Sequence, residues 1–311
     1  MTPVISVVIC TYNNADSLAL TLGQLSRQEG PEPGSFEVIV VNNNSPDHTD
    51  AVVEPYLKPG GSVEFRYLFE PRQGLSHARN TGMKEARGAF ILFTDDDADI
   101  PAGWVRRYLD VIQSCAPDCV YSKIKIIWDK AVPWWFVPEY TPCFVGLDYG
   151  DDLIEVDDPR MEFFGKNFCV RADLLRSMGG FDPALGRVGT KLAAGEETLI
   201  FRGLLSAGKK LIYIPDAEVG HRLKAREYLA SNILRLNVDA AGSTYHSARR
   251  NARKRFMGRP ARLIVDATMD LARAFLRVPV HLLSLDKARL YFEYVNVRRD
   301  LALITHWVRD A

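Results

Sequence analysis

Three adjacent carboxylates, Asp95, Asp96 and Asp97, directly follow a short apolar run at residues 89–94. A run of this length and composition is typical of a buried strand. Three like charges are costly to bury together unless a cation neutralises them, and open α/β sheets bind ligands at the carboxyl ends of their strands. Oxygen ligands favour Mg²⁺ or Mn²⁺, which usually also hold phosphate oxygens. The triplet therefore indicates a metal-dependent enzyme acting on a diphosphate. The alternative is a solvated acidic loop that caps a helix beginning near Pro101.

Strand-like and helix-like segments alternate in the first part of the chain. Apolar, β-branched runs predict strands at 5–10, 36–41, 63–69 and 89–93, and helical patterns follow at 15–28, 48–57 and 74–87. This alternation favours a parallel sheet with right-handed crossovers. Polar residues follow three of these strands, at 11–14, 42–47 and 95–97. Because the carboxyl ends of parallel strands meet at one edge, we expect these residues to form a single site.

The pattern changes from about residue 120 onward. Further strands are predicted at 120–128, 163–170 and 211–214, an aromatic loop at 133–138, and a helix from Gly195 to near Gly208. From residue 225 the chain is predicted to be helical to its end. The length of 311 residues is sufficient for one large α/β domain plus an appendage.

The net charge of zero conceals an uneven distribution. Residues 222–311 hold 18 Lys and Arg against 8 Asp and Glu, whereas residues 1–221 hold 21 against 31. An acidic body with a basic tail suggests that the tail meets an anionic partner. No apolar stretch approaches the roughly 18–20 residues of a membrane span, and the N-terminus lacks a secretory signal. The five cysteines have no metal-site spacing and suit a reducing compartment, so we expect a cytoplasmic protein.

Several short motifs, in their order and spacing, resemble those of the family 2 glycosyltransferases, whose nucleotide-sugar-binding fold is called GT-A. The motifs are residues 6–13, 40–47, 74–82, 93–97 with Pro101, 165–167, 179–182, 195–197, and 215–217 with His221. The match covers roughly residues 3–223. The resemblance implies a GT-A-like α/β domain at 1–223, with a mixed, mostly parallel sheet flanked by helices. A basic, helical C-terminal extension at 224–311 lies outside the shared part.

The resemblance implies that Thr11 and Tyr12, at the first strand tip, contact the nucleotide. The Tyr12 ring would stack on the base, unless it belongs to the core. The second strand tip of the family usually carries an acidic residue that binds uracil, whereas this chain has Asn42 and Asn43 there. An amide can both accept and donate, so the base remains open. The alternative is that the asparagines serve the left-handed backbone of a tight turn.

The acidic triplet corresponds to the metal motif of the family. By this resemblance Asp97, together with Asp95, holds Mg²⁺ or Mn²⁺, and Asp96 contacts ribose or sugar. His221 matches a position that supplies a further metal ligand in some members, although a lone histidine is more often structural. The bound metal would stabilise the leaving nucleoside diphosphate.

Charged residues outside the triplet are assigned to the diphosphate and to proton transfer. Arg79, and more loosely Arg72, could reach the diphosphate, the alternative being solvated surface charges. Glu197, beside Glu196, occupies the position of the family's catalytic base, which is more commonly Asp. One carboxylate that takes the proton of the acceptor hydroxyl suffices for inversion by direct displacement. Glu196 is the second choice for this role, and a structural cap of the helix is the alternative for both.

The acceptor is expected to meet Trp134 and Trp135 in the aromatic loop, and Asn167 in the 165–167 motif. Aromatic faces suit sugar rings or lipid chains, the alternative being a small hydrophobic core under the loop. In the extension, a basic cluster is followed by amphipathic stretches at 263–276 and 282–303. The cluster is Arg249, Arg250, Arg253, Lys254, Arg255, Arg259 and Arg262.

This combination predicts contact of the extension with an anionic membrane surface, on the inner face of the membrane. Packing of the helices on the catalytic body, or a dimer contact, are the alternatives. We expect no nucleic-acid partner, because the body is acidic and contains no recognised module.

The predicted function is inverting, metal-dependent transfer of a sugar from a nucleoside-diphosphate sugar to a hydroxyl of a glycan or lipid-linked acceptor, in polysaccharide or cell-envelope glycan synthesis. One alternative is a nucleotidylyltransferase of similar fold, against which the chain lacks a triphosphate loop rich in glycine and arginine after its first strand. The other alternative is a non-catalytic scaffold protein that binds sugar nucleotides.

Overall fold

The computed structural model describes residues 2–58, 60–186, 195–251 and 255–309. Its contacts divide the chain into two compact units. The first comprises Met1–Ile127 and Phe144–Arg222, and the second comprises Trp128–Cys143 and Leu223–Ala311. The segment that contains the aromatic loop therefore groups with the C-terminal helices, although it interrupts the first unit in sequence.

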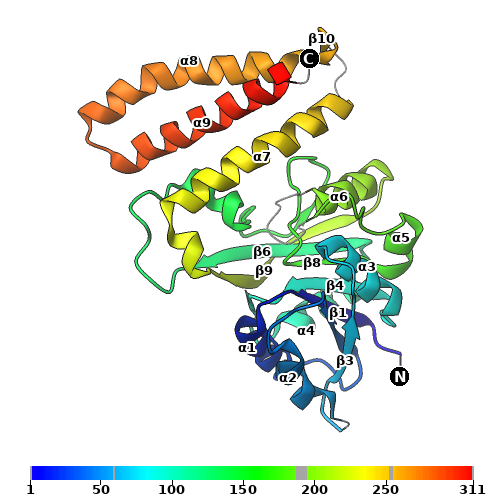
Figure 1. The fold of residues 1–311 in the computed structure, drawn as a ribbon. Coiled ribbons are helices and arrows are strands. Elements are labelled where there is room, and N and C mark those ends of the chain that lie inside the picture. Colours follow the sequence, from blue (N-terminus) through cyan, green and yellow to red (C-terminus); the bar gives the residue numbers. More distant parts are fainter. Residues whose placement is uncertain (1, 59, 187–194, 252–254, 310–311) are drawn as a thin grey trace. The chain divides into compact units, whose positions relative to one another are not determined.

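Within the described residues, nine strands of the first unit form one sheet in the order β3-β2-β1-β4-β8-β6-β9-β5, with β7 paired to β9 (Figure 1). The strands are β1 Ile5–Thr11, β2 Phe36–Asn42, β3 Glu64–Phe69, β4 Phe90–Asp95, β5 Ala98–Asp99, β6 Cys119–Ile127, β7 Ile154–Glu155, β8 Phe168–Arg171 and β9 Leu211–Arg222. Strands β1 to β4 are mutually parallel, as are β6 and β9. Strands β5, β7 and β8 run antiparallel to their neighbours.

The predicted mixed, mostly parallel α/β sheet is confirmed, and two strands differ in extent from the prediction. The strand expected at 163–170 begins only at Phe168, so that residues 163–167 form a loop before β8. The strand expected at 211–214 continues to Arg222, because β9 pairs with β6 on both sides of an irregularity between Ser122 and Ile124. His221 consequently lies on a strand rather than after one.

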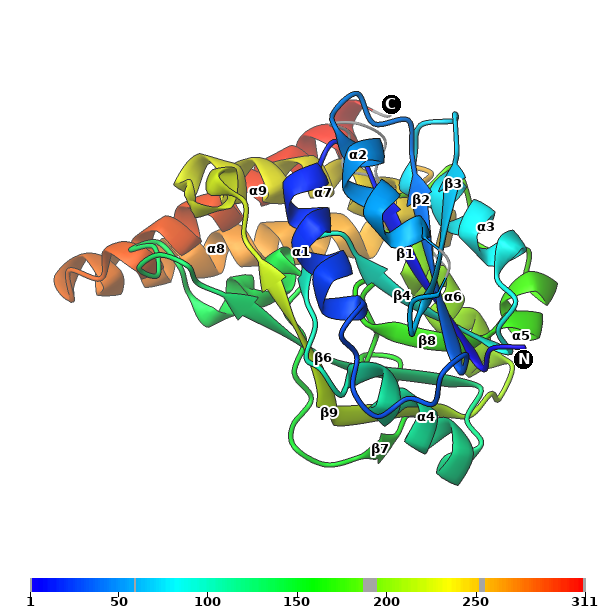
Figure 2. The ribbon, with the colours of Figure 1, turned by 90° about the horizontal axis from the view of Figure 1, so that it is seen from below.

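Helices cover both faces of this sheet. The helices of the first unit are α1 Ala15–Leu25, α2 Thr49–Val53, α3 Leu75–Glu85, α4 Trp104–Cys115, α5 Ala172–Ser177 and α6 Glu196–Ser206, and the 3-10 helix η1 is Glu54–Leu57. Figure 2 shows α1 and α2 on one side of β1 and β2, and α3 on the other. Helix α3 lies close to the sheet, since a Cβ at Gly82 would stand 2.5 Å from Cγ1 of Val8.

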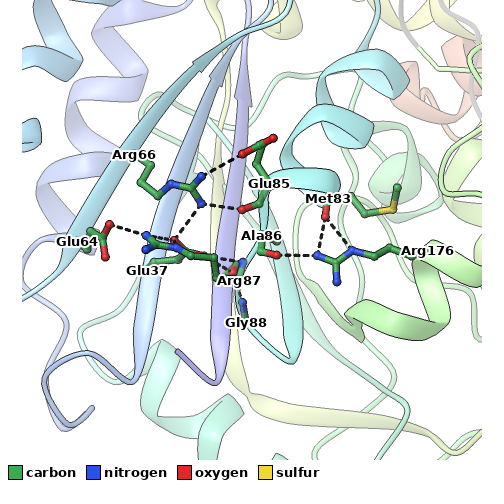
Figure 3. A network of polar contacts seen from close by, with 10 residues as sticks. Glu37, Glu64, Arg66, Met83, Glu85, Ala86, Arg87, Gly88 and Arg176 are labelled. Carbon is green, nitrogen blue, oxygen red and sulfur yellow. Dashed lines mark hydrogen bonds and ion pairs between the residues drawn. The ribbon is translucent and has the colours of Figure 1, made fainter. Parts of the chain in front are cut away.

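A polar network around the buried carboxylate of Glu37 closes the amino end of the sheet (Figure 3). Glu37 is 1% exposed and accepts hydrogen bonds from Ser6 Oγ at 2.7 Å and from the backbone N–H of Arg87 at 2.9 Å. Burial alone would raise the pKa of Glu37, but these hydrogen bonds outweigh it and lower that pKa. Arg176 donates to the carbonyl oxygens of Met83 and Ala86 at the end of α3. The network stabilises the amino end of the sheet, and it does not involve the carboxyl ends of the strands, where the predicted site residues lie.

The second unit is built from three long helices. They are α7 Ala230–Asn251, α8 Ala261–Leu283 and α9 Lys287–Arg309, with the 3-10 helices η2 Pro138–Phe144, which ends in the first unit, and η3 Ala225–Tyr228. Helix α9 packs against both α7 and α8 (Figure 1). The predicted C-terminal helices are therefore confirmed, with one addition, a hairpin of β10 Arg255–Phe256 and β11 Arg259–Pro260. Arg253 and Lys254 of the basic cluster lie outside the described residues.

None of the helices in the described parts of the chain is both long enough and apolar enough to cross a membrane.

Candidate active site

The first strand tip is tied to the acidic triplet. Thr11, the last residue of β1, donates through Oγ1 to Oδ2 of Asp96 at 2.7 Å. Asn14 donates through Nδ2 to Oδ1 of the same carboxylate at 2.6 Å. Asp96 is 8% exposed, whereas Tyr12 is 43% exposed. The carboxylate is thus held in place by the β1 turn, and the aromatic ring beside it is accessible for stacking.

At the second strand tip, the amide of Asn42 is already used by the protein. Its Nδ2 donates to the hydroxyl of Tyr67 at 2.6 Å and to Asp50 Oδ1 at 3.1 Å, and its Oδ1 accepts from the backbone N–H of Ser45 at 2.8 Å. Asn44 has a φ of 60°, the left-handed conformation expected of an asparagine in a tight turn. Asn42 therefore holds the turn through its side chain, and the left-handed backbone conformation lies at Asn44.

Asn43 is likewise engaged, and it orders the loop that carries Arg72. Its Nδ2 donates to the carbonyl oxygens of Glu70 at 3.1 Å and Arg72 at 2.6 Å, and its Oδ1 accepts from the N–H of Gly74 at 2.8 Å. Arg72 is largely exposed and pairs with Glu70 through Nε at 2.8 Å. The Arg72 hydrogen bonds, with one from Thr81, lower the pKa of Glu70 to about 2. This ion pair leaves Arg72 at the surface of the loop.

Arg79 of α3 connects the acidic triplet to helix α6. Its side chain is 3% exposed, and Nη1 lies 2.9 Å from Glu196 Oε1 and 3.6 Å from Glu197 Oε1. Nη2 lies 3.9 Å from Asp95 Oδ1, and the guanidinium lies over the Phe181 ring at 5.4 Å. Burial would lower the pKa of Arg79, but the glutamates and Asp95 outweigh it and raise that pKa. One buried cation therefore brings together carboxylates from two distant segments.

The two glutamates that begin α6 differ in their surroundings. The Glu196 side chain is 4% exposed, and its Oε2 has no hydrogen-bond partner among the described residues. Burial, followed by the negative charge of Glu197, raises the pKa of Glu196 to about 7, against the opposing effect of Arg79. The Glu197 side chain is 19% exposed, and its Oε1 accepts from the N–H of Gly165 at 3.2 Å. Glu197 is thus the more accessible carboxylate of the pair.

Lys166 supplies a second buried cation at the triplet. It lies in the loop before β8 and is 1% exposed. Its Nζ donates a hydrogen bond to Asp97 and lies 3.2 Å from Asp95 Oδ2. Burial would lower the pKa of Lys166, but the two carboxylates outweigh it and raise that pKa. Burial also tends to raise the pKa of Asp95, and Lys166, assisted by Arg79, reverses this to a net lowering.

His221 lies beside the triplet because β9 pairs with β5. Its register partner is Ala98, the residue after Asp97. Nε2 of His221 is 3.7 Å from Asp97 Oδ2, and Nδ1 is 2.7 Å from the carbonyl oxygen of Phe144. Two carboxylates and an imidazole are donors that suit Mg²⁺ or Mn²⁺.

No group of three or more such side chains in the described residues converges on one point. Magnesium-like ions commonly take one or two carboxylates from the protein and complete their coordination with substrate phosphates and water. An ion at Asp95 and Asp97 would therefore have to take its remaining ligands from a diphosphate and water, with His221 close by.

Asn167 is fully buried and does not face a solvent-accessible surface. Its Oδ1 accepts from Trp104 Nε1 at 3.0 Å and from the Tyr108 hydroxyl at 2.8 Å. Its Nδ2 donates to the carbonyl oxygens of Lys123 at 2.8 Å and Ala217 at 2.9 Å. Asn167 thereby joins helix α4 to the sheet directly behind Lys166.

The two tryptophans predicted to meet the acceptor belong to the second unit. Trp134 is 61% exposed, and its ring lies 5.6 Å from that of Tyr291. Trp135 is 1% exposed, and its Nε1 donates to the carbonyl oxygen of Tyr228 at 3.3 Å. Trp134 is therefore available to a ligand, whereas Trp135 forms part of the interior of its unit.

Most of the predicted site residues gather at the carboxyl edge of the sheet. The contacts described above link Thr11, Arg79, Asp95, Asp96, Asp97, Glu196, Glu197 and His221. Two further residues were missed by sequence reasoning. Asn14 stands in the polar turn after the first strand and Lys166 in the 165–167 motif, so their positions in these motifs were the available signals.

Comparisons with known proteins agree with this architecture. The sequence model described as Glycosyl transferase family 2 matches residues 6–177. A glucosyl-dolichyl phosphate glucuronosyltransferase of Haloferax volcanii is 27% identical over 233 residues, which are 70% of this chain and 69% of that protein. The succinoglycan biosynthesis protein ExoM of Rhizobium meliloti is 27% identical over 217 residues, 69% of this chain and 65% of that protein. The aligned region thus spans about two thirds of each relative.

A solved structure with the same fold is that of the mannosyltransferase PcManGT from Pyrobaculum calidifontis, in complex with GDP-Man and Mn²⁺. It superimposes with a TM-score of 0.64 at 19% identity and covers 100% of this chain and 88% of that one. The GT-A type of fold predicted from the sequence is confirmed by this likeness. Since the family match covers more than half of the 311 residues, the chain belongs to glycosyl transferase family 2 and is a glycosyltransferase.

Proposed function

We propose that this glycosyltransferase moves a sugar, with inversion at the anomeric carbon, from a nucleoside-diphosphate sugar to a hydroxyl of a glycan or lipid-linked acceptor. The observation that carries the proposal is the link made by Arg79, which joins Asp95 of the acidic triplet to Glu196 and Glu197. A diphosphate-binding edge and a candidate base are thereby side by side, as direct displacement requires. The names of the relatives, which refer to succinoglycan and a dolichyl phosphate, support such acceptors.

In the proposed mechanism, the oxygen of the acceptor hydroxyl attacks the anomeric carbon while Glu197 takes the proton of that hydroxyl. Its partial exposure and its hydrogen bond from Gly165 support this assignment. A divalent ion, when bound by Asp97 and Asp95 with His221, would neutralise negative charge on the leaving nucleoside diphosphate. Arg79 keeps the glutamates oriented.

For the donor, Asp96 would accept from ribose or sugar hydroxyls, and Tyr12 would stack on the base. Asn42 and Asn43 are proposed to shape the base pocket rather than to read the base through their amides, because those amides are occupied by protein partners. Trp134 remains the candidate contact for an acceptor sugar or lipid.

The two alternative functions receive no support. A nucleotidylyltransferase would not be expected to match the family 2 glycosyltransferase model over residues 6–177, and a non-catalytic scaffold would show no sugar transfer in an activity assay.

The donor class is tested by thermal stability with UDP, dTDP, GDP or CDP, each with Mn²⁺ or with a chelator. A nucleotide at 100-fold its Kd should stabilise the protein by about 2.7 kcal/mol, since it binds only the folded state. We expect one nucleotide to raise the Tm in the presence of Mn²⁺ and to lose most of this effect with chelator. Absence of a shift with all four nucleotides would contradict the proposed donor site.

We also propose that the outer face of α8 contacts an anionic lipid surface. Ala267 and Ala274 of α8 are buried on the side that packs on α9, while an apolar stripe on the opposite side is exposed. Its members recur every three or four residues along one face. They are Val265, Met269, Ala272, Leu276, Val280 and Leu283. Arg262, Arg273 and Arg277 border the stripe, and the side chain of each is more than half exposed. They pair with Asp266, Asp270 and Glu293 respectively, so these carboxylates compensate part of the positive charge that the arginines offer to acidic headgroups.

This contact predicts that the protein floats with vesicles of phosphatidylcholine and phosphatidylserine, and that salt weakens the association. L276D, which puts a charge into the stripe, should reduce flotation strongly, whereas L20D on α1, also at an exposed leucine, should not. Equal flotation of the wild type with and without phosphatidylserine would contradict the role of charge. A concentration-dependent dimer that L276D abolishes would assign the stripe to a second copy of the chain instead.

A further inference from the structure

Lys166 occupies the position between the two carboxylates that are the proposed metal ligands. Its Nζ donates a hydrogen bond to Asp97 and stands 3.2 Å from Asp95 Oδ2. The Lys166 side chain is 1% exposed, and that of Asp97 is 11% exposed. A buried ammonium is tolerated only when anionic groups surround it, and a buried carboxylate only when cations or hydrogen-bond donors surround it. Lys166 therefore compensates part of the negative charge of the two carboxylates, and Arg79 assists it at Asp95.

The loop that carries Lys166 has little freedom to place this side chain elsewhere. Gly165 donates its N–H to Glu197 Oε1 at 3.2 Å. A Cβ at position 165 would stand 1.9 Å from Arg79 Nη2 and 2.7 Å from Glu197 Oε1, so only glycine fits there. On the other side of Lys166, Asn167 is fixed by four hydrogen bonds to α4 and to the sheet. The backbone is thus clamped, and only the flexible four-carbon stem of Lys166 can move its charge.

We infer that Lys166 is an internal competitor of the divalent ion, so that metal binding is coupled to nucleotide binding. An ion that binds Asp95 and Asp97 must displace the ammonium, and without an anionic ligand the displaced charge would remain buried and unpaired. A diphosphate bound at the same edge offers Lys166 new oxygen partners. Metal and nucleoside diphosphate therefore assist each other's binding, by the same factor in both directions. The inference rests on the proposed metal-dependent function and adds a residue that couples the binding of the metal to that of the nucleotide.

Mn²⁺ binding, followed by the electron paramagnetic resonance signal of the free ion, tests the coupling without an activity assay. The wild type should bind Mn²⁺ weakly alone and about 5–150-fold more tightly with the matching nucleotide, which is the usual range of such coupling. K166M should bind Mn²⁺ alone at least about tenfold more tightly than the wild type, with a smaller gain from nucleotide. K123M is the matched control, because Lys123 pairs with two aspartates, Asp148 and Asp151, away from the triplet.

K166M removes a buried cation from beside Asp95 and Asp97, so this variant is expected to be less stable than the wild type. Mn²⁺ should then raise the Tm of K166M more than that of the wild type, and K166Q, which keeps a hydrogen-bond donor without the charge, should show the same tighter binding. If K166M and K166Q bind Mn²⁺ no more tightly than the wild type, Lys166 is a structural ion pair and the inference fails while the proposed function stands. If no protein binds Mn²⁺ even with UDP or GDP, the metal dependence of the proposed function fails as well.

Discussion

Sugar transfer by E197Q is expected to fall by about 10²–10⁴-fold, the usual contribution of a general base, while binding of the nucleoside diphosphate persists. The substitution keeps the size and the polar character of the side chain but removes its capacity to take a proton. The donor-side groups are not altered, because Glu197 contacts Gly165 and Arg79 rather than the carboxylates of the triplet. Release of nucleoside diphosphate from a panel of sugar nucleotides, with acceptor present, measures the rate, and thermal shift measures binding.

Two further variants test whether Glu197 is the catalytic base. E54Q changes an exposed glutamate in η1 of the same unit and should retain full activity. E196Q removes the carboxyl group whose pKa is raised to about 7, and if this variant loses transfer while E197Q retains it, the base is Glu196. Retention of transfer by both E197Q and E196Q would show that neither glutamate is the base.

R79M should destabilise the protein by about 3–5 kcal/mol, the effect of breaking a buried ion pair by removing one partner. Arg79 is the buried cation that faces Glu196, Glu197 and Asp95, so its loss leaves these carboxylates with less compensation. The pKa of Glu196, already raised by burial and Glu197, should rise further because Arg79 is the group that opposes this rise. Urea-induced unfolding at neutral pH measures the change in the free energy of unfolding.

The control for R79M is R106M on α4. Arg106 pairs with Asp110 one helical turn away, and both side chains are about half exposed. Exposed pairs of this kind contribute less than about 1 kcal/mol. If R79M costs no more than R106M, Arg79 does not hold the two acidic segments together, and the link between the triplet and α6 must have another basis.

Local sequence patterns were sufficient to predict the strands whose carboxyl ends line the site. Strand β4 is the apolar run that ends in the triplet, and Thr11 and Asn42 end β1 and β2 at the same edge, because these strands are parallel. What each polar residue does there was not readable from the pattern. The side-chain amide of Asn43, for example, forms hydrogen bonds with backbone groups as far as Gly74, thirty-one positions along the chain.

The sequence by itself determined the family, the alternation of strands and helices up to β4 and the position of the acidic triplet, because apolar periodicity and short motifs are local properties. Only the tertiary structure decided which charges meet. Strand β8 inserts antiparallel between β4 and β6, and this brings Lys166 to Asp97 across 69 positions. Arg79 similarly reaches Glu196 across 117 positions. Burial removes water as a competing partner for these charges, so each carboxylate depends on the cation that lies nearest to it in space. No local sequence pattern encodes which cation that is.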